Sequence, residues 1–393
     1  MPQCVGGNTA AISGWLDNDM LDRPDPLATT NHQVRPDRGG EAGGPESTVD
    51  ASIASLLERL SSGELVADPG VVRLGPTMVG RINDEVVAPL RLIAERGGKA
   101  WRAALSLTVC EALGGDPSAL EPWTGVIELL HVGSLIVDDV QDQSELRRGG
   151  PCCHHVYDEA RALNAGCSAY FLLDEMIEAV PASADTKLAM YRLFFQTLRA
   201  AHAGQGVDLG GLAQAARAAV HGGDLSGLVR TVLDVHRLKT GYPVVLCAQL
   251  GALTAAAAPA SLDAMSRYAM ALGTALQIGD DLLSLRGFER GLKTSGEDLL
   301  AGKITTPVAL TLASLPRPEA AAFLERLLTP MKRDSDLAAL QRQIEDADAP
   351  DACLELAADL LECAWAEVAP HLRPGPARDA LKHYGRLFLH RQF

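Results

Sequence analysis

The sequence has no excess of positive charge and no long hydrophobic run. Its 50 acidic residues outnumber 35 basic ones, and a formal net charge of -15 would repel the phosphate backbone that nucleic-acid-binding proteins must neutralise. Apolar segments such as Val244–Leu250 and Ala252–Ala258 are interrupted or rich in alanine, so none offers the roughly 20 apolar residues of a membrane span. The sequence therefore excludes nucleic acid as a partner and predicts no membrane span.

The sequence also lacks a cluster of cysteines and a secretory signal. Eight cysteines are scattered over 393 residues, which is typical of free thiols in a reducing compartment and not of a small disulfide-stabilised domain. The N-terminus has no positive residue ahead of an apolar stretch, unlike a signal peptide. We therefore expect a cytoplasmic location and no disulfides.

Strand signals are weak, because aromatic residues make up only 4% of the chain and β-branched alternation is nearly absent. Alanine and leucine instead recur at a period near 3.6 residues, which is typical of helices. Breakers such as Gly97-Gly98, Gly222-Gly223 and Pro259 separate roughly ten predicted helices. The fold class is therefore all-α, and no composition shift marks a second domain.

The N-terminal segment differs from the rest. Residues 1–49 are rich in Gly, Pro, Asp and Asn without an apolar period, so they predict a disordered tail. From Asp50, which is placed as an N-cap, apolar residues recur at helical spacing up to a stop at Gly63. One all-helical domain is therefore expected over residues 50–393.

A first acidic motif lies in the segment ELLHVGSLIVDDVQD. Helical spacing places His131, Ser134, Asp138 and Asp142 on one stripe, with Asp139 about 100° away. Carboxylates one turn apart on an apolar helix repel each other unless a cation compensates them. Oxygen ligands of this kind suit Mg²⁺, which usually completes its coordination with waters and substrate phosphates.

A second acidic pair lies in ALQIGDDLLSL, where Gln277, Asp280, Asp281 and Ser284 occupy the polar part of an apolar helix. Either pair alone is more simply explained as a helix turn that reaches solvent. Two pairs, each on an apolar helix and each followed by basic residues, predict a magnesium clamp between facing helices.

Basic residues beside glycines or helix ends could balance the negative charge of the acidic motifs and of a bound phosphate group. They are Lys99, Arg102, Arg147, Arg148, Lys239, Lys293 and Lys303. In a strongly acidic protein this placement favours diphosphate binding, although any one of them taken singly is typical of a solvated positive face.

Taken in order, GGKAWR, the first acidic segment with its LRRGGP continuation, GQGVDL, LKTG, LQIGDDLLSL and KTSGEDLLAGKITTPV resemble the trans-polyprenyl synthetase family, and within it geranylgeranyl diphosphate synthases. The resemblance runs from about residue 70 to near the C-terminus. It implies an antiparallel helical bundle around a central cavity, a homodimer, and a Mg²⁺-dependent enzyme that condenses isopentenyl diphosphate with an allylic diphosphate. It further implies three Mg²⁺ ions.

The resemblance also assigns roles. The expected catalytic residues are Asp138, Asp142, Lys239, Thr240, Gln277 and Asp280. The expected metal ligands are Asp138, Asp139, Asp142, Asp280 and Asp281. Lys99, Arg102, Arg148 and His131 are expected to bind isopentenyl diphosphate, and Arg147, Lys239, Lys303 and Lys293 the allylic diphosphate.

Three positions depart from the family pattern. Ser284 stands where many members have a third aspartate, Leu276 where an aromatic often precedes the glutamine, and Cys167 where an aspartate is common. A divergent terpene cyclase or aromatic prenyltransferase on the same scaffold therefore stays an alternative, as does the regulatory subunit of a heteromeric synthase. The presence of Lys99, Arg102 and Arg148 favours chain elongation over the cyclase.

Small residues one turn below the first acidic motif bear on product length. In the family, bulky aromatics at the positions of Gly133 and Ser134 stop growth at C15, so this chain is expected to make C20 products or longer. Tyr170 and Phe171 are candidate floor residues of the pocket, although aromatic residues on helices more often simply pack in the core.

The run Cys152-Cys153-His154-His155 suggests zinc at first sight. Four consecutive residues cannot readily converge on one tetrahedral ion, because zinc sites leave chain between ligand pairs. No zinc site is predicted there.

Overall fold

The computed structural model describes residues 45–389 apart from 69, 99, 122–123, 180–181, 287–294 and 331–333. Two predicted site residues, Lys99 and Lys293, lie outside the described residues, as does most of the predicted tail. The first described helix, α2, begins at Pro45 and not at Asp50. Glycine ends this segment as predicted, since the helix stops at Ser61 and Gly63 adopts a φ of 80°.

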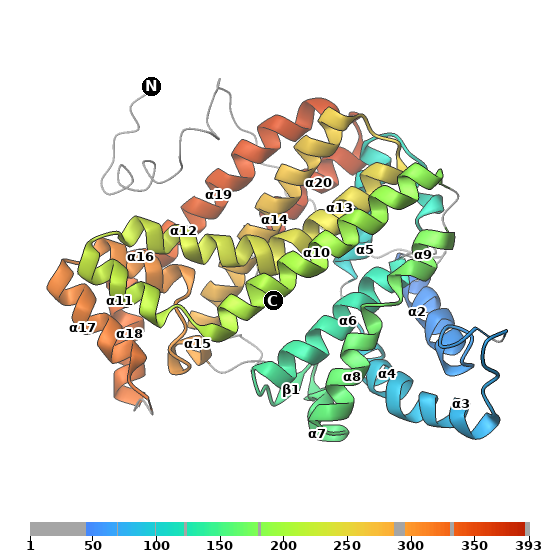
Figure 1. The fold of residues 1–393 in the computed structure, drawn as a ribbon. Coiled ribbons are helices and arrows are strands. Elements are labelled where there is room, and N and C mark those ends of the chain that lie inside the picture. The colour runs from blue at the N-terminus through green and yellow to red at the C-terminus, as the bar shows by residue number, and fades with distance from the viewer. Residues whose placement is uncertain are drawn as a thin grey trace.

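The described chain is almost entirely helical (Figure 1), which confirms the predicted all-α class. The helices are α2 (Pro45–Ser61), α3 (Pro76–Ile82), α4 (Ala88–Ala94), α5 (Trp101–Ala112), α6 (Thr124–Gln141), α7 (Cys153–Val156), α8 (Glu159–Ala169), α9 (Leu173–Ala179), α10 (Ala184–Gly210), α11 (Ala213–Gly222), α12 (Leu225–His236), α13 (Tyr242–Thr254), α14 (Pro259–Arg286), α15 (Glu297–Leu300), α16 (Thr306–Ser314), α17 (Arg317–Leu328), α18 (Asp334–Asp346), α19 (Ala349–Val368) and α20 (Pro376–Leu389). Short π-helical turns, η2 (Asn83–Val87) and η5 (Arg237–Gly241), precede α4 and α13, and 3₁₀ turns lie at η3 (Pro117–Ala119) and η6 (Ala369–His371).

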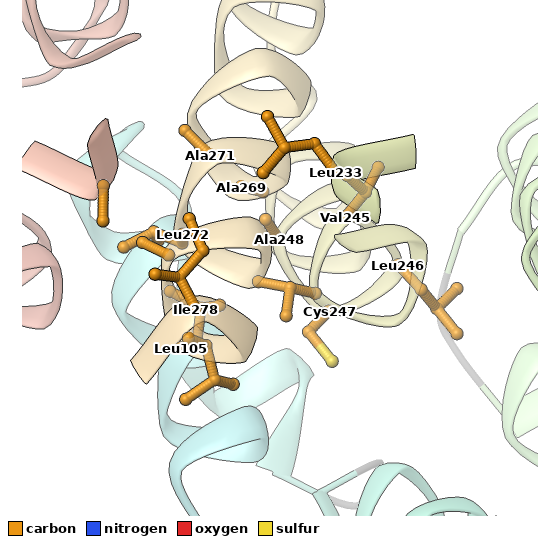
Figure 2. Close-up of a cluster of buried hydrophobic side chains, with 14 of the residues drawn as sticks. Leu105, Leu233, Val245, Leu246, Cys247, Ala248, Ala269, Ala271, Leu272 and Ile278 are labelled. Carbon is orange, nitrogen blue, oxygen red and sulfur yellow. The ribbon is translucent and has the colours of Figure 1, made fainter. Parts of the chain in front are cut away.

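Helix α14 forms the centre of the bundle. It packs against α13, α19 and α20, and α13 packs in turn against α5. Figure 2 shows the interdigitated side chains of this region, among them Leu105, Val245, Ala248, Leu272 and Ile278. Helix α13 is apolar nearly all round, so burial between neighbours stabilises it more than its intrinsic propensity does.

Glycines allow two of the helix pairs to approach closely. A Cβ atom on Gly133 of α6 would lie 2.5 Å from the carbonyl oxygen of Gly166 on α8, and one on Gly166 would lie 2.9 Å from that of Gly133. A Cβ on Gly273 of α14 would likewise lie 2.6 Å from Cα of Gly241. These contacts fix the spacing of the helices that surround the central cavity.

Several helices begin at side-chain caps. Asp224 accepts a hydrogen bond from the Gly227 amide at 2.9 Å at the start of α12. Ser183 accepts from Thr186 at the start of α10. Since these oxygens satisfy amide groups that have no partner in the first turn, the breakers in the sequence define helix starts as well as helix ends.

The only strands in the described residues form a small hairpin after α6. Strand β1 (Leu146–Arg147) pairs antiparallel with β2 (Gly150–Pro151), with Arg147 opposite Gly150. Arg148 and Gly149, with φ of 50° and 76°, form the two-residue turn. Positive φ at both central positions is the signature of a type I′ hairpin turn.

None of the described helices is both long enough and apolar enough to cross a membrane.

Candidate active site

A central cavity of about 500 Å³ is lined by α6, α10, α12, α13, α14, η5 and the segment that precedes α16. It gathers most of the predicted site residues. Those that line it are Arg102, His131, Ser134, Asp138, Asp142, Arg147, Tyr170, Lys239, Thr240, Gln277, Asp280, Asp281 and Lys303. The remaining described candidates, Gly133, Asp139, Arg148 and Phe171, do not line it.

The first acidic motif faces cations across the cavity. Asp138 accepts a hydrogen bond from Nε2 of Gln205 at 3.0 Å and lies 3.5 Å from Nζ of Lys239. Asp142 lies 3.5 Å from Nζ of Lys303. Burial and the neighbouring Asp138 raise the pKa of Asp142 above its ordinary value, although Lys303 and Lys239 oppose this shift. The two carboxylates therefore share a site whose negative charge is only partly compensated by the protein.

Asp139 has a different environment. Its side chain is fully buried, at 0% exposure, and Nε of Arg147 donates to its Oδ1 at 2.9 Å while Nη2 of Arg147 also donates to Oδ1. An arginine fork on a carboxylate fixes both partners in orientation. The structure thus places Asp139 behind the cavity wall, where it holds Arg147, and does not bring it to the cavity with Asp138 and Asp142.

The second acidic motif divides less completely. Asp280 and Asp281 both line the cavity, but Asp281 is only 6% exposed. Nε2 of His236 lies 3.0 Å from Oδ2 of Asp281, and the Thr306 amide donates to the same oxygen at 2.9 Å. Burial opposes ionisation of Asp281, but these partners outweigh it and lower the pKa of its carboxyl. Asp281 therefore joins α12, α14 and α16 from inside.

The π-helical turn η5 brings Lys239 and Thr240 to the cavity. Nζ of Lys239 donates to Asp208 of α10 at 2.8 Å, and Thr240 donates to Oε1 of Gln277 at 2.7 Å. Burial opposes the charge of Lys239, but Asp138 and Asp208 outweigh it and raise the pKa of the ammonium group. Turns of this type are frequent at functional sites.

Glycine makes this approach possible, because a Cβ on Gly204 of α10 would lie 2.6 Å from the Lys239 amide nitrogen. Gly204 belongs to the GQGVDL segment, whose Gln205 and Asp208 contact Asp138 and Lys239. Neither residue was predicted as part of the site from the sequence. Their spacing of three residues on one helix face is the signal that could have identified them.

Ser284, the residue at the position of a missing aspartate, is 5% exposed. Its Oγ accepts from the Asp298 amide at 3.4 Å, and its carbonyl oxygen accepts from Gly296 at 2.7 Å. Asp298 lines the cavity and lies 3.8 Å from Lys303. The site therefore includes the carboxylate of Asp298 on α15, which the sequence of the second motif did not predict.

A second group of cations lies near His131. Burial and the charges of Arg102, Arg148 and Arg147 hold the pKa of His131 well below its ordinary value, so the ring is neutral at pH 7. The Arg102 guanidinium stacks over Trp101, with its carbon 4.4 Å from the ring centroid. Burial also lowers the pKa of Arg148. This convergence of positive charge in a partly dry site is suited to a multiply charged anion.

Glu128, which the sequence analysis did not consider, lies behind these cations. It is 5% exposed and accepts a hydrogen bond from the Ala103 amide at 3.3 Å. Its charge opposes the lowering of the Arg148 pKa. One buried carboxylate thus offsets part of the repulsion among the basic side chains.

An apolar extension of the cavity descends along α6. Ser134 and Leu130 line it, and on the far side the ring of Tyr170 meets His202 edge-on with centroids 5.5 Å apart. Thr197 lines the same wall, and within the described residues its buried hydroxyl has no hydrogen-bond partner. His202 and Thr197 lie on α10, where no local sequence pattern distinguished them.

Two of the four residues proposed for product length lie elsewhere. Gly133 faces α8, where its lack of a side chain serves helix packing. Phe171 is 71% exposed, because α8 ends at Ala169 and the turn that follows directs Tyr170 inward and Phe171 outward. Of the four candidates for product length, only Ser134 and Tyr170 line the cavity.

Across the part of the chain that the structure describes, no three His, Cys, Asp or Glu side chains are gathered closely enough to hold a metal ion by themselves. Cys152 and Cys153 are buried thiols whose pKa values burial raises. The cavity carboxylates Asp138, Asp142 and Asp280 are hard oxygen donors spread over two helices. Such a set fits Mg²⁺ that is completed by waters and phosphate oxygens.

Comparisons with known proteins give the chain its family. Residues 83–346 match the model of the polyprenyl synthetase family. The chain is 33% identical to farnesyl diphosphate synthase of Geobacillus stearothermophilus over 276 residues, which is 68% of this chain and 84% of that one. It is 32% identical to geranylgeranyl pyrophosphate synthase 3 of Arabidopsis thaliana over 54% of this chain and 59% of the plant protein.

Solved structures have the same fold. Geranylgeranyl pyrophosphate synthase of Corynebacterium glutamicum, complexed with isoprenyl diphosphate and magnesium, superposes with a TM-score of 0.72 at 23% identity over 88% of this chain and 99% of that one. Polyprenyl synthase of Caulobacter crescentus, complexed with calcium and isoprenyl diphosphate, gives 0.68 at 24% identity over 90% and 100% of the two chains. The chain therefore belongs to the polyprenyl synthetase family and is a prenyltransferase of the isoprenyl diphosphate synthase class.

Proposed function

We propose that the chain condenses isopentenyl diphosphate with an allylic diphosphate to give a trans-prenyl diphosphate of C20 or longer, in a Mg²⁺-dependent reaction. The observation that carries the proposal is the shared cavity, whose lining includes both acidic motifs, the cations Arg102, Arg147, Lys239 and Lys303, and apolar side chains of α6. The cations can hold two diphosphates, and the apolar part of the cavity can take the growing tail.

The allylic diphosphate would lie between the two acidic motifs. Lys239, Arg147 and Lys303 line this part of the cavity. Burial opposes the charges of Lys239 and Lys303, but the neighbouring carboxylates outweigh it and raise the pKa of both ammonium groups. Asp138, Asp142 and Asp280 would hold Mg²⁺, for which we propose three ions. Bound Mg²⁺ supplies charge stabilisation to the departing diphosphate.

Isopentenyl diphosphate would lie beside His131. Arg102 and Arg148 supply fixed positive charge there, and the neutral His131 ring can donate one hydrogen bond without adding repulsion. Lys99, in the GGKAWR segment, is the remaining donor of this subsite in the proposal. Because guanidinium groups stay protonated, this subsite would bind its diphosphate over a wide pH range.

The reaction follows from this arrangement. Cations around the allylic diphosphate favour cleavage of its C–O bond, which leaves a carbocation on the prenyl chain. The hydroxyl of Thr240 donates to Oε1 of Gln277, which leaves the lone pairs of the Thr240 oxygen and one lone pair of the Gln277 oxygen free to face that carbon. The alkene of isopentenyl diphosphate attacks the carbocation, and the released diphosphate takes the proton lost from the adduct.

Product length would depend on the apolar extension. Ser134 is small enough for the tail to pass, and the pair of Tyr170 and His202 can form a floor. A floor at this depth favours a C20 product, geranylgeranyl diphosphate.

The two alternatives fit the site less well. A terpene cyclase or aromatic prenyltransferase has no need of a second diphosphate subsite, yet Arg102 and Arg148 both act on His131. A regulatory subunit has no need of metal ligands, yet Asp138, Asp142 and Asp280 all line the cavity. Both features support a catalytic chain-elongating enzyme.

We also propose a homodimer. Phe171 is 71% exposed, and Phe195 and Leu188 on α10 are 51% and 46% exposed. Exposed apolar side chains of this size favour burial against another protein surface. The cytoplasmic location inferred from the N-terminal sequence stays a prediction.

The direct test is an assay of purified protein with labelled isopentenyl diphosphate, Mg²⁺ and C5, C10 or C15 allylic primers, followed by sizing of the products. The proposal expects products of C20 or longer that depend on both substrates and on the metal. Release of diphosphate from the allylic primer alone, with cyclic hydrocarbons as products, would instead identify a cyclase.

A further inference from the structure

Arg96, at the end of the α4 segment, reaches across to the β-hairpin that carries Arg147 and Arg148. Its Nη1 donates to the carbonyl oxygen of Arg147 at 3.0 Å and to that of Pro151 at 2.8 Å. One guanidinium nitrogen therefore bridges both strands of the hairpin. No sequence pattern pointed to this residue.

A glycine makes room for this contact. A Cβ atom on Gly150 would lie 2.8 Å from the guanidinium carbon of Arg96, so any other residue there would displace the arginine. Gly150 does not have a positive φ, and the backbone itself does not require glycine. Glycine at position 150 is instead explained by the close approach of the Arg96 guanidinium group.

The reciprocal contact comes from the hairpin. Nη1 of Arg148 donates to the carbonyl oxygen of Ile93 on α4 at 3.1 Å, and a Cβ on Gly98 would lie 2.9 Å from Nη2 of Arg148. Each arginine thus crosses to the opposite segment, donates to backbone oxygen and lies over a glycine. We name Arg96, Arg148, Gly98 and Gly150 the arginine clasp.

The hairpin needs such a tie. Arg148 occupies the first central position of the I′ turn with a φ of 50°, a conformation that residues with a Cβ disfavour. Arg102, Arg147 and Arg148 are also close enough for all three charges to act on His131, so these arginines repel one another. Asp139 independently holds Arg147 through its fork, whereas Arg148 relies on the contacts of the clasp.

We propose that Arg96 is a positioning residue for isopentenyl diphosphate, because it holds the hairpin against the Gly97-Gly98 segment so that Arg148 and Arg102 approach the same diphosphate. This inference rests on the proposed function. It adds a residue that touches no substrate and acts through Arg148.

The test compares Arg96→Met with Arg91→Met. Arg91 lies on α4, shortly before Arg96 in the chain, but its contacts are Glu95 at 3.9 Å and Ser61 at 3.4 Å, so this control removes an equal charge without touching the clasp. For Arg96→Met we expect the KM for isopentenyl diphosphate to rise roughly five- to tenfold, as suits the loss of charge-assisted hydrogen bonds. The KM for the allylic substrate should stay within about twofold, because Asp139 still holds Arg147.

Three further variants separate positioning from general loss of structure. Gly150→Ala should displace Arg96 and reproduce its KM effect, and the double variant Arg96→Met, Gly150→Ala should be no worse than either single change. Arg96→Lys should recover part of the effect, because an ammonium group can still reach one carbonyl oxygen. Thermal midpoints should stay close to that of the wild type in all of them.

Calorimetric titration with isopentenyl diphosphate alone measures the same subsite without turnover, and it should give a matching rise in Kd. An unchanged Kd and KM in Arg96→Met would overturn the inference while condensation by the wild type still upheld the proposed function. Equal increases in both KM values with a lower thermal midpoint would also overturn it, since they would indicate a structural role. Tight binding without condensation by the wild type would contradict the proposed function and leave the test of Arg96 valid.

Discussion

The two acidic motifs of this protein look alike in sequence and differ in how each uses its second aspartate. In both, the first residue of the pair, Asp138 or Asp280, lines the cavity. The next residue, Asp139 or Asp281, lies about 100° further round the helix and is buried. Asp139 does not reach the cavity, whereas Asp281 is part of its lining, but both buried carboxylates are held by partners within the protein.

The partners of the buried carboxylates differ. Asp139 is held by Arg147, which itself lines the cavity, whereas Asp281 is held by His236 and the Thr306 amide inside the bundle. Loss of Asp139 should therefore alter substrate binding, and loss of Asp281 should alter stability.

The largest effect is expected where a carboxylate faces the cavity. Asp138→Ala and Asp280→Ala should each lower kcat/KM by roughly 10²- to 10³-fold or more, because each removes charge stabilisation of the transition state. Far-UV circular dichroism should be unchanged. Asp263→Ala, an exposed position on the same helix as Asp280, is the control, and near-wild-type turnover in both cavity variants would refute the assignment.

A second prediction compares the buried carboxylates directly. Asp139→Asn should raise the KM for the allylic substrate by about tenfold, since Arg147 loses a charge-assisted partner. Asp281→Asn should instead lower the free energy of unfolding by about 1–3 kcal/mol, measured by denaturant titration. If Asp281→Asn left stability intact and abolished activity, Asp281 would act in the cavity as Asp280 does.

Below the carboxylates the two motif helices also differ, because α6 continues along the apolar extension with Ser134 and Leu130. Ser134→Phe should block the tail and shorten the product toward C15. Tyr170→Ala and His202→Ala should lengthen it, and Phe171→Ala should leave product length unchanged. Chromatographic sizing checks all four, and an unchanged product from an active Ser134→Phe enzyme would show that the tail does not follow α6.

The smallest effect is expected at the third position of the second motif. Ser284→Asp would add a carboxylate beside Asp298, so the Mg²⁺ concentration for half-maximal activity should fall about two- to threefold, a modest gain because Asp298 already supplies charge nearby. A collapse of activity would instead mean that the contact of Ser284 with the Asp298 amide is required.

Much of this site was accessible from the sequence, because helical spacing alone places His131, Ser134, Asp138 and Asp142 on one stripe. All four line the cavity. Spacing also gave the angle between Asp138 and Asp139, but it could not tell which partner would bury Asp139. That depends on Arg147, whose hairpin folds back onto α6.

Other features depend on contacts between distant segments. A side chain on Gly133 would clash with the backbone of Gly166 on α8. The end of α8 at Ala169 directs Phe171 away from the cavity. His202 and His236 lie on helices with no local pattern that marks them. Sequence reasoning identified the residues that share a helix face, and it missed those that meet only after folding.

The most direct test of the contrast between the motifs is calorimetric titration of Mg²⁺ into the protein bound to a non-reactive allylic diphosphate analogue. Asp138→Asn and Asp280→Asn should each reduce the number of ions bound, and Asp139→Asn and Asp281→Asn should retain the wild-type number. Loss of an ion in Asp139→Asn or Asp281→Asn would contradict the account, because it would make the buried carboxylates metal ligands.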